Sequence, residues 1–146
     1  MPNLHALCRA VSPAIADCEL SFIGREPIDA AKAQRQHDDY VALLRQLGAE
    51  VIALPSEPDL PDSVFVEDAV LMFDELAVLT RPGALSRRPE VAAIQQTVPQ
   101  VREIVHEIQA PGTLDGGDVL RIGKQVYVGR SARSNQAAID QLADFL

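Results

Sequence analysis

Apolar and polar positions follow one another along the chain in a pattern that predicts strands and helices in turn. Apolar runs over 4–11 and 50–54 predict two strands. Helical spacing over 28–47 predicts a helix between them, which ends at Gly48 because glycine adopts the left-handed conformation that often closes a helix. Residues 66–81 then predict a hairpin that turns at 74–75. This order of elements is typical of an α/β domain.

The second half of the chain continues in the same manner. Pro89 suits the first turn of a helix that includes Val98, and a strand is expected over 101–108. A second hairpin is expected over 119–128, and a last helix is expected to begin near Ser134, a good N-cap residue.

The turn after the first hairpin carries a more specific signal. Pro82-Gly83 is typical of a type II turn, because proline presets the first dihedral angle and glycine accepts a positive φ at the second position. We therefore expect Gly83 to have a positive φ.

The two hairpins carry related motifs. Glu67-Asp68 opens the first hairpin and Gly117-Asp118 opens the second, about 50 residues later, a period found in repeated architectures. The alternative is that hairpins of unrelated α/β proteins look alike. The last helix reaches Leu146 with no capping glycine and no strand after it, so the third unit is expected to be interrupted.

Composition narrows the classes of partner. The chain is 47% hydrophobic and has a formal net charge of −8, which predicts a globular domain whose acidic surface binds neither nucleic acid nor an anionic membrane. No apolar run approaches the roughly 20 residues that span a bilayer. The chain has only two cysteines, Cys8 and Cys18, which indicates a reducing cytoplasm and no disulfide framework.

A carboxylate-rich motif precedes the first hairpin. Asp62, Glu67 and Asp68 fall within seven positions, and paired carboxylates are natural partners of a planar guanidinium, which presents a fork of N–H donors. Glu67 and Asp68 can serve one site only if the strand begins, bends or bulges there, because consecutive strand residues point to opposite faces. The alternative is a solvated acidic end of a strand.

A glycine-rich motif, 112–118, precedes the second hairpin. Its glycines allow a tight turn and a close approach to a ligand, and one of its two aspartates, Asp115 or Asp118, could orient a histidine in a nucleophile–base–orienter arrangement. A plain glycine-rich turn and a cation-binding loop are the alternatives. The motif lacks the alternating oxygen ligands of a calcium loop, so we expect no metal and no cofactor.

Arginines follow both hairpins at corresponding positions of the repeat. Arg87 and Arg88 follow the first, and Arg130 and Arg133 follow the second. An arginine in a loop can bind a carboxylate of a substrate in a two-pronged way. The alternative is that these arginines pair with the acidic surface and contribute little.

Together these motifs resemble the dimethylarginine dimethylaminohydrolase family, and the resemblance runs from about residue 30 to 136. It rests on Phe-Val-Glu-Asp at 65–68, on Thr-Arg-Pro-Gly-Ala at 80–84 with Ser-Arg-Arg at 86–88, on 110–118 and on 129–135. Arginine deiminases and amidinotransferases share the fold and a similar Gly-rich loop, but they differ in the first motif.

The resemblance implies an α/β fold of the pentein type, a propeller of five ββαβ modules around a central channel. About three modules would be present here, over 1–60, 61–110 and an incomplete 111–146. It also implies hydrolysis of N-methylated arginine to citrulline and a methylamine through a Cys-thiouronium intermediate.

The resemblance also implies roles for particular residues. Asp115 would orient the catalytic histidine, and Arg87 and Arg133 would hold the α-carboxylate of the substrate. The guanidinium pocket would be formed by Asp62, Phe65, Glu67 and Asp68, with Leu20 in a mobile lid.

The family keeps its catalytic histidine and cysteine in later modules, which this chain does not contain, so residues 1–146 alone are expected to be inactive. Two alternatives stay open: an arginine deiminase-like activity, and a non-catalytic module that binds a guanidino ligand or a partner subunit. The apolar faces of an unfinished propeller favour association, so a homo-oligomer is one expected state.

Overall fold

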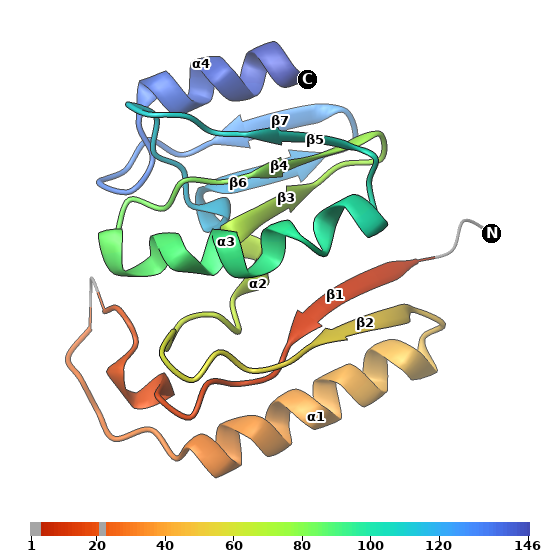
Figure 1. The fold of residues 1–146 in the computed structure, drawn as a ribbon, viewed down its shortest axis with the longest axis vertical. Helices are drawn as coiled ribbons and strands as arrows, with labels where there is room; N and C mark the ends of the chain where they lie inside the picture. Colours follow the sequence, from red (N-terminus) through yellow and green to blue (C-terminus); the bar gives the residue numbers. More distant parts are fainter. Residues whose placement is uncertain (1–3, 21–22) are drawn as a thin grey trace. The chain divides into compact units, whose positions relative to one another are not determined.

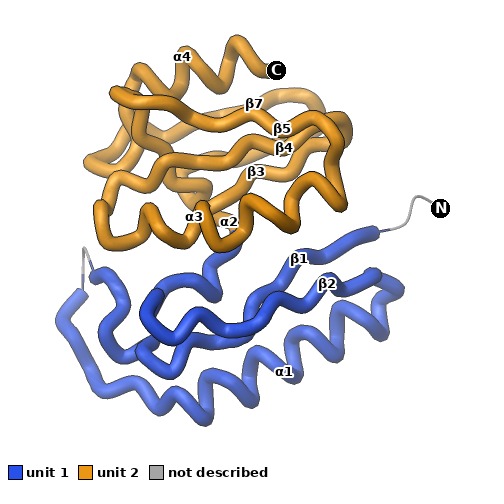
Figure 2. Tube along the Cα trace, in the orientation of Figure 1, with its two compact units in different colours: residues 1–66 blue, residues 67–146 orange. Residues whose placement is uncertain are grey.

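The computed structural model describes residues 4–20 and 23–146. The chain forms two compact units, Met1–Val66 and Glu67–Leu146, which are distinguished by colour in Figure 2. Each unit is described by itself.

Unit 1 is a parallel pair of strands with one long helix. β1 (His5–Arg9) pairs with β2 (Glu50–Leu54) in parallel, and the connection between them contains the 3-10 turn η1 (Ile15–Asp17) and α1 (Ala30–Gln46). Figure 1 shows α1 running alongside these strands, as expected because a parallel pair needs a crossover. Gly48 has a φ of 88°, which confirms the predicted end of the helix.

Unit 2 contains two small sheets, the helices α3 and α4, and several short helical turns. β3 (Val70–Met72), β4 (Leu76–Leu79) and β5 (Ile104–Glu107) form a sheet in which β3 and β4 are antiparallel and β4 and β5 are parallel. β6 (Val119–Ile122) and β7 (Gln125–Val128) form an antiparallel hairpin, as predicted.

Short helices join and follow these strands (Figure 1). The 3-10 turn η2 (Leu85–Arg87), α3 (Arg88–Gln95) and the 3-10 turn η3 (Val98–Gln100) connect β4 to β5. The 3-10 turn η4 (Gly116–Asp118) precedes β6, and α4 (Gln136–Phe145) follows β7. The hairpin-then-helix order therefore occurs twice in unit 2.

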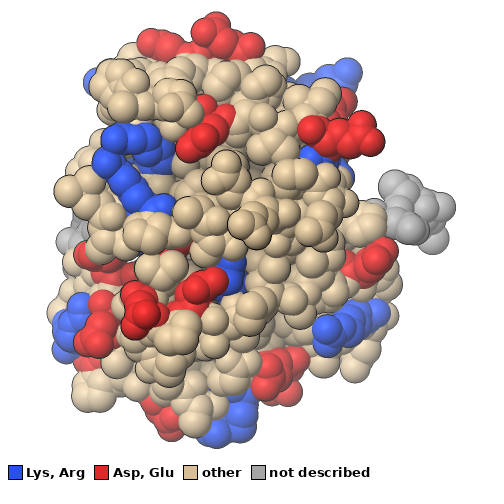
Figure 3. Space-filling view, viewed as in Figure 1, with Lys and Arg blue, Asp and Glu red and all other residues tan. Residues whose placement is uncertain are grey.

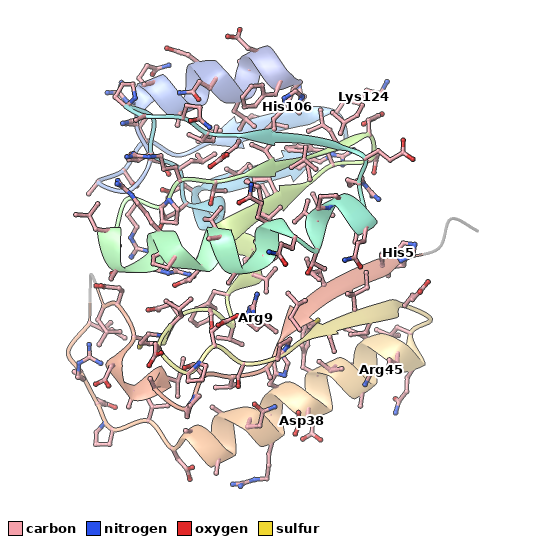
Figure 4. All side chains as sticks on the ribbon, viewed as in Figure 1. His5, Arg9, Asp38, Arg45, His106 and Lys124 are labelled. Carbon is pink, nitrogen blue, oxygen red and sulfur yellow. The ribbon has the colours of Figure 1, made fainter. Side chains whose placement is uncertain are left out.

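The core of unit 2 lies between its sheets and α4. The buried cluster consists of Phe73, Val78, Ile108, Leu114, Ala138 and Leu142. Val119, Val126 and Val128 pack against it from the second hairpin. His106 of β5 is labelled beside α4 in Figure 4, and its ring stacks on Phe145 with the centroids 4.5 Å apart.

The structure corrects several expectations about local conformation. Residues 66–69 form a helical turn, α2 (Val66–Ala69), and the strand begins only at Val70. Val98 starts a separate 3-10 turn and does not continue α3. The N-cap of α4 is Asn135, because its side chain accepts the N–H of Ala138, whereas Ser134 is used elsewhere.

Gly83 does not have the positive φ that a type II turn requires; among the described residues, positive φ values are found at Gly48 and Gly123. Glycine is needed at position 83 because a Cβ there would lie 2.6 Å from the Cα of Arg133. The requirement is a close approach between backbones, which a local turn pattern cannot reveal.

The sheets of the described chain are open, with two or three strands each, and none of them closes on itself. The three-module division over 1–60, 61–110 and 111–146 stays a prediction. Within residues 4–20 and 23–146, no helix is both long and apolar enough to cross a membrane.

Candidate functional site

The acidic motif is carried by a helical turn, where consecutive residues are not forced to opposite faces. Glu67 is exposed on α2, and the Asp68 side chain is 17% exposed. Thr80, at the end of β4, holds the backbone here: its Oγ1 donates to the Asp68 carbonyl at 2.6 Å, and its N–H donates to the Ala69 carbonyl at 3.0 Å. The position of Asp68 is therefore fixed by a neighbouring strand.

Both carboxylate oxygens of Asp68 accept hydrogen bonds. Oδ1 accepts the backbone N–H of Gly117 at 2.8 Å, and Oδ2 accepts Nη1 of Arg87 at 2.8 Å. The first bond joins the two sequence motifs, which are 49 residues apart. The structure thus brings Asp68 of the acidic motif into contact with Gly117 of the glycine-rich motif.

Arg87 lies between two carboxylates and is only 4% exposed. Its Nε and Nη2 donate to Oε1 and Oε2 of Glu90 at 3.0 and 2.9 Å, while Nη1 reaches Asp68. Burial alone would lower the pKa of Arg87, but its hydrogen bonds to Glu90 and Asp68 and their charges raise it overall. Arg87 therefore stays cationic.

Asp115 is buried, at 2% exposure, in the loop before η4. Its Oδ1 accepts the N–H of Gly83 at 3.0 Å, and its Oδ2 lies 3.5 Å from Nη1 of Arg133. The backbone N–H of Asp115 donates to Ser134 Oγ at 3.1 Å. The Asp115 carboxylate is therefore held by groups from both arginine-containing loops.

The loop that carries Arg133 is fastened by Asp118. Asp118 Oδ2 accepts the hydroxyls of Ser131 and Ser134 at 2.7 and 2.6 Å, and the Arg133 N–H donates to Ser131 Oγ at 2.9 Å. The Arg133 side chain is 35% exposed. Arg133 therefore combines a fixed backbone with a side chain that is partly exposed to solvent.

The remaining predicted site residues, Leu20, Asp62 and Phe65, belong to unit 1. Asp62 is 5% exposed, and its Oδ2 accepts the Glu19 N–H at 2.9 Å. Phe65 is 42% exposed. Leu20 lines a hollow of about 450 Å³ together with Ile23 and neighbouring residues. The joint participation of both units in one site stays a prediction.

Sequence reasoning missed four residues that hold the candidate site together: Thr80, Glu90, Asp118 and Ser134. Glu90 left a local signal, because Arg87 and Glu90 are spaced i, i+3 at the start of a helix, where such pairs interact. The other three act through contacts that local patterns do not encode.

The turn ends of the hairpins in unit 2 form a different feature. A hollow of about 620 Å³ there is lined by Asp74, Glu75, Arg121, Lys124 and mainly apolar neighbours. Lys124 is labelled at this turn in Figure 4. These residues lie at the hairpin tips, whereas Asp68 and Asp115 lie before the first strands of the two hairpins, so this hollow is separate from the candidate site.

Charge and metal-ligand patterns among the described residues add two facts. On the face seen in Figure 3, acidic and basic side chains occur in small groups among neutral ones. Within residues 4–20 and 23–146, no group of three or more His, Cys, Asp or Glu side chains is arranged to hold a metal ion.

Comparison with known proteins gives a consistent result. The family model described as "N,N dimethylarginine dimethylhydrolase, eukaryotic" matches residues 21–146. The chain belongs to this family. An N(G),N(G)-dimethylarginine dimethylaminohydrolase of Streptomyces coelicolor is 46% identical over 142 residues, which cover 97% of this chain and 55% of that protein.

Solved structures support the same assignment. A mutant dimethylarginine dimethylaminohydrolase of Pseudomonas aeruginosa, complexed with citrulline, superposes with a TM-score of 0.91 at 37% identity, covering 97% of this chain and 56% of that one. A cyanobacterial arginine dihydrolase, the N-terminal domain of ArgZ, has a TM-score of 0.85 at 20% identity over 98% of this chain and 54% of that one, which shows a shared fold alone.

The chain spans about half the length of the curated dimethylarginine dimethylaminohydrolases that it matches. Family membership and the α/β fold of these enzymes are established by the comparisons. The activity of the whole protein and the roles of individual residues are proposals.

Proposed function

We propose that the protein carrying these residues hydrolyses N-methylated arginine to citrulline and a methylamine, and that residues 1–146 supply substrate-binding groups and Asp115. The observation that carries the proposal is the contact between the two motifs, in which the Gly117 N–H donates to Asp68 at 2.8 Å. It places carboxylates and arginines from distant parts of the sequence within one region of unit 2.

The chemistry of this region suits such a substrate. A methylated arginine carries a planar guanidinium at one end and an α-carboxylate at the other. Glu67 and Asp68 can accept charge-assisted hydrogen bonds from the guanidinium, and Arg133 can donate to the α-carboxylate. In this proposal Arg87 stays paired with Glu90 and Asp68 and supports the acidic residues. The family resemblance also assigns guanidinium-binding roles to Asp62 and Phe65 and a lid role to Leu20, all three in unit 1.

Asp115 is proposed to orient the histidine that serves as general acid and base. A buried carboxylate that accepts an imidazole N–H fixes the tautomer and the direction of the ring. The family resemblance assigns the attacking thiolate and this histidine to residues outside 1–146. Cys8 and Cys18 are both buried in unit 1 and are not proposed as the nucleophile. We also propose a cytoplasmic location, supported by the low cysteine count.

The test compares two proteins. One is residues 1–146 alone, and the other, called the joined protein here, is the same chain continued by the unmatched C-terminal part of the Streptomyces coelicolor relative. We expect citrulline release from dimethylarginine by the joined protein only. A folded joined protein without turnover, or turnover by the short chain that Cys8→Ser or Cys18→Ser abolishes, would contradict the proposal.

The arginine deiminase alternative is separated by the substrate in the same assay. Faster citrulline release from arginine than from dimethylarginine would favour that alternative. The matched control is the Asp115→Asn variant, which is expected to lose turnover on either substrate if Asp115 orients the histidine.

A binding module is the second candidate, and one observation favours it. The outward face of the β6–β7 hairpin exposes Leu120, Ile122 and Tyr127 to 57%, 59% and 50%. Leu120 and Tyr127 are directly opposite each other in the hairpin, so their side chains share one face. Light scattering after size exclusion would detect self-association, and Leu120→Ser would be expected to weaken it.

A further inference from the structure

A continuous chain of hydrogen bonds runs from helix α3 to the glycine-rich loop. It begins at the Glu90 carboxylate, passes through the guanidinium of Arg87 to the carboxylate of Asp68, and ends at the backbone N–H of Gly117. Its first member, Glu90, belongs to neither of the motifs from which the candidate site was predicted.

The contact between Glu90 and Arg87 fixes the orientation of the Arg87 guanidinium. Two parallel hydrogen bonds from Nε and Nη2 hold one edge of the planar guanidinium, so the group can neither rotate about its Cδ–Nε bond nor tilt without breaking one of them. The Nη1 amino group of the guanidinium thereby points at Asp68 Oδ2, 2.8 Å away. A single charge contact would leave these rotations open.

Glu90 is itself held firmly. It lies in the first turn of α3 and is only 4% exposed. The N-terminal end of a helix carries a partial positive charge, which favours a carboxylate there. A buried carboxylate is retained only when it is paired and hydrogen-bonded, and Arg87 provides both conditions.

We propose that Glu90 is a positioning residue, which acts through Arg87 to set the orientation of the Asp68 carboxylate and the place of the Gly117 loop. This proposal rests on the proposed function where it concerns ligand affinity. Each oxygen of a carboxylate can accept a second hydrogen bond. Because Arg87 and Gly117 each donate to one oxygen of the Asp68 carboxylate, its remaining acceptor sites point in one defined direction.

The first measurement uses wild-type residues 1–146 and nuclear magnetic resonance. The Nε–H of Arg87 is expected to exchange with solvent much more slowly than that of Arg45, an exposed arginine on α1 that is labelled in Figure 4. Equal exchange rates for the two groups would show that the Glu90 contact does not persist in solution and would overturn the proposal. This measurement uses only the wild-type chain, so it does not depend on whether a variant folds.

The second measurement compares Glu90→Gln with Glu103→Gln, whose parent residue is an exposed glutamate before β5. The Glu90→Gln change keeps the size of the side chain but replaces one acceptor by a donor that cannot pair with Arg87. We expect the amide resonance of Gly117 to shift in Glu90→Gln and to stay in place in Glu103→Gln. An unchanged Gly117 resonance in a folded Glu90→Gln protein would overturn the proposal.

The third measurement titrates citrulline into the joined protein that carries the same substitutions. Glu90→Gln is expected to weaken citrulline binding about tenfold. The double variant Asp68→Asn with Glu90→Gln is expected to lose less binding free energy than the sum of the two single losses, because the two residues act through one network. Additive effects would contradict the proposed relay. If the joined protein with unchanged residues 1–146 does not bind citrulline, the proposed function fails, while the first two measurements still decide the role of Glu90.

Discussion

Gly116 lies so close to the backbone of Glu67 that a Cβ atom at position 116 would come within 1.8 Å of the Glu67 carbonyl oxygen. Real Cβ atoms do not approach an oxygen this closely, so the two backbones touch at this point only because residue 116 is glycine. The glycine-rich motif thus allows the second hairpin to begin directly against the acidic motif. In this structure, Gly116 of the glycine-rich motif allows the two backbones to come into contact.

The first prediction concerns this contact. Gly116→Ala is expected to lower the free energy of unfolding by about 1–3 kcal/mol or more, because the backbones must move apart to admit the methyl group. Urea unfolding would measure it. Gly24→Ala is the matched control: a Cβ there meets nothing within 4 Å, so a change of at most about 1 kcal/mol is expected. Equal effects of the two variants would contradict the close approach.

A second prediction concerns the start of α4. Asn135→Ala removes a side-chain oxygen that accepts the N–H groups of Ala138 and Thr113 at 3.0 and 3.1 Å. Loss of an N-cap costs roughly 1 kcal/mol, and the second bond adds to this cost. Urea unfolding of Gln136→Ala, an exposed neighbour, serves as the control and should change by less than about 0.5 kcal/mol. An Asn135→Ala variant as stable as this control would show that the cap lies elsewhere.

The third prediction compares two aspartates of unit 2. In the joined protein, Asp68→Asn is expected to weaken citrulline binding by about 10- to 100-fold, because a charge-assisted hydrogen bond contributes roughly 1.5–3 kcal/mol. Asp74→Asn is expected to have little effect, since the Asp74 side chain is 72% exposed at the hairpin tip. Calorimetry with citrulline, the product in the proposed reaction, avoids turnover. Equal affinities of the two variants would place the binding site elsewhere.

The fourth prediction concerns pH. The hydrogen bond from Arg121, and then its charge, lower the pKa of Asp74 below its ordinary value. A lowered pKa in the folded state means that the ion pair contributes stability above the ordinary pKa of aspartate and that this contribution is lost as the pH falls through the folded-state pKa. Titration of the Asp74 carboxyl by nuclear magnetic resonance should show a higher midpoint in Arg121→Gln than in the wild type. The same midpoint in both proteins would refute the pairing.

Most of the elements could be predicted from the sequence because their signals are local. The spacing of apolar residues predicted both strands of unit 1 and α1. The second hairpin was predicted with the same bounds that β6 and β7 have in the structure. The motifs were sufficient to predict the family, because they combine several unusual residue types at fixed spacings. The resemblance carried by these motifs also selected Asp68, Arg87, Asp115 and Arg133, which the structure places in one unit.

The tertiary structure alone decided how these residues are connected. The bond from Gly117 to Asp68 joins positions 49 apart, and the bond from Gly83 to Asp115 joins positions 32 apart. A periodic pattern reports which face of an element is buried, but it carries no information on which distant backbone lies against that face. For this reason the sequence predicted a strand where α2 forms and a positive φ at Gly83. The contact that matters at Gly83 is with Arg133, a residue that only the folded chain brings near.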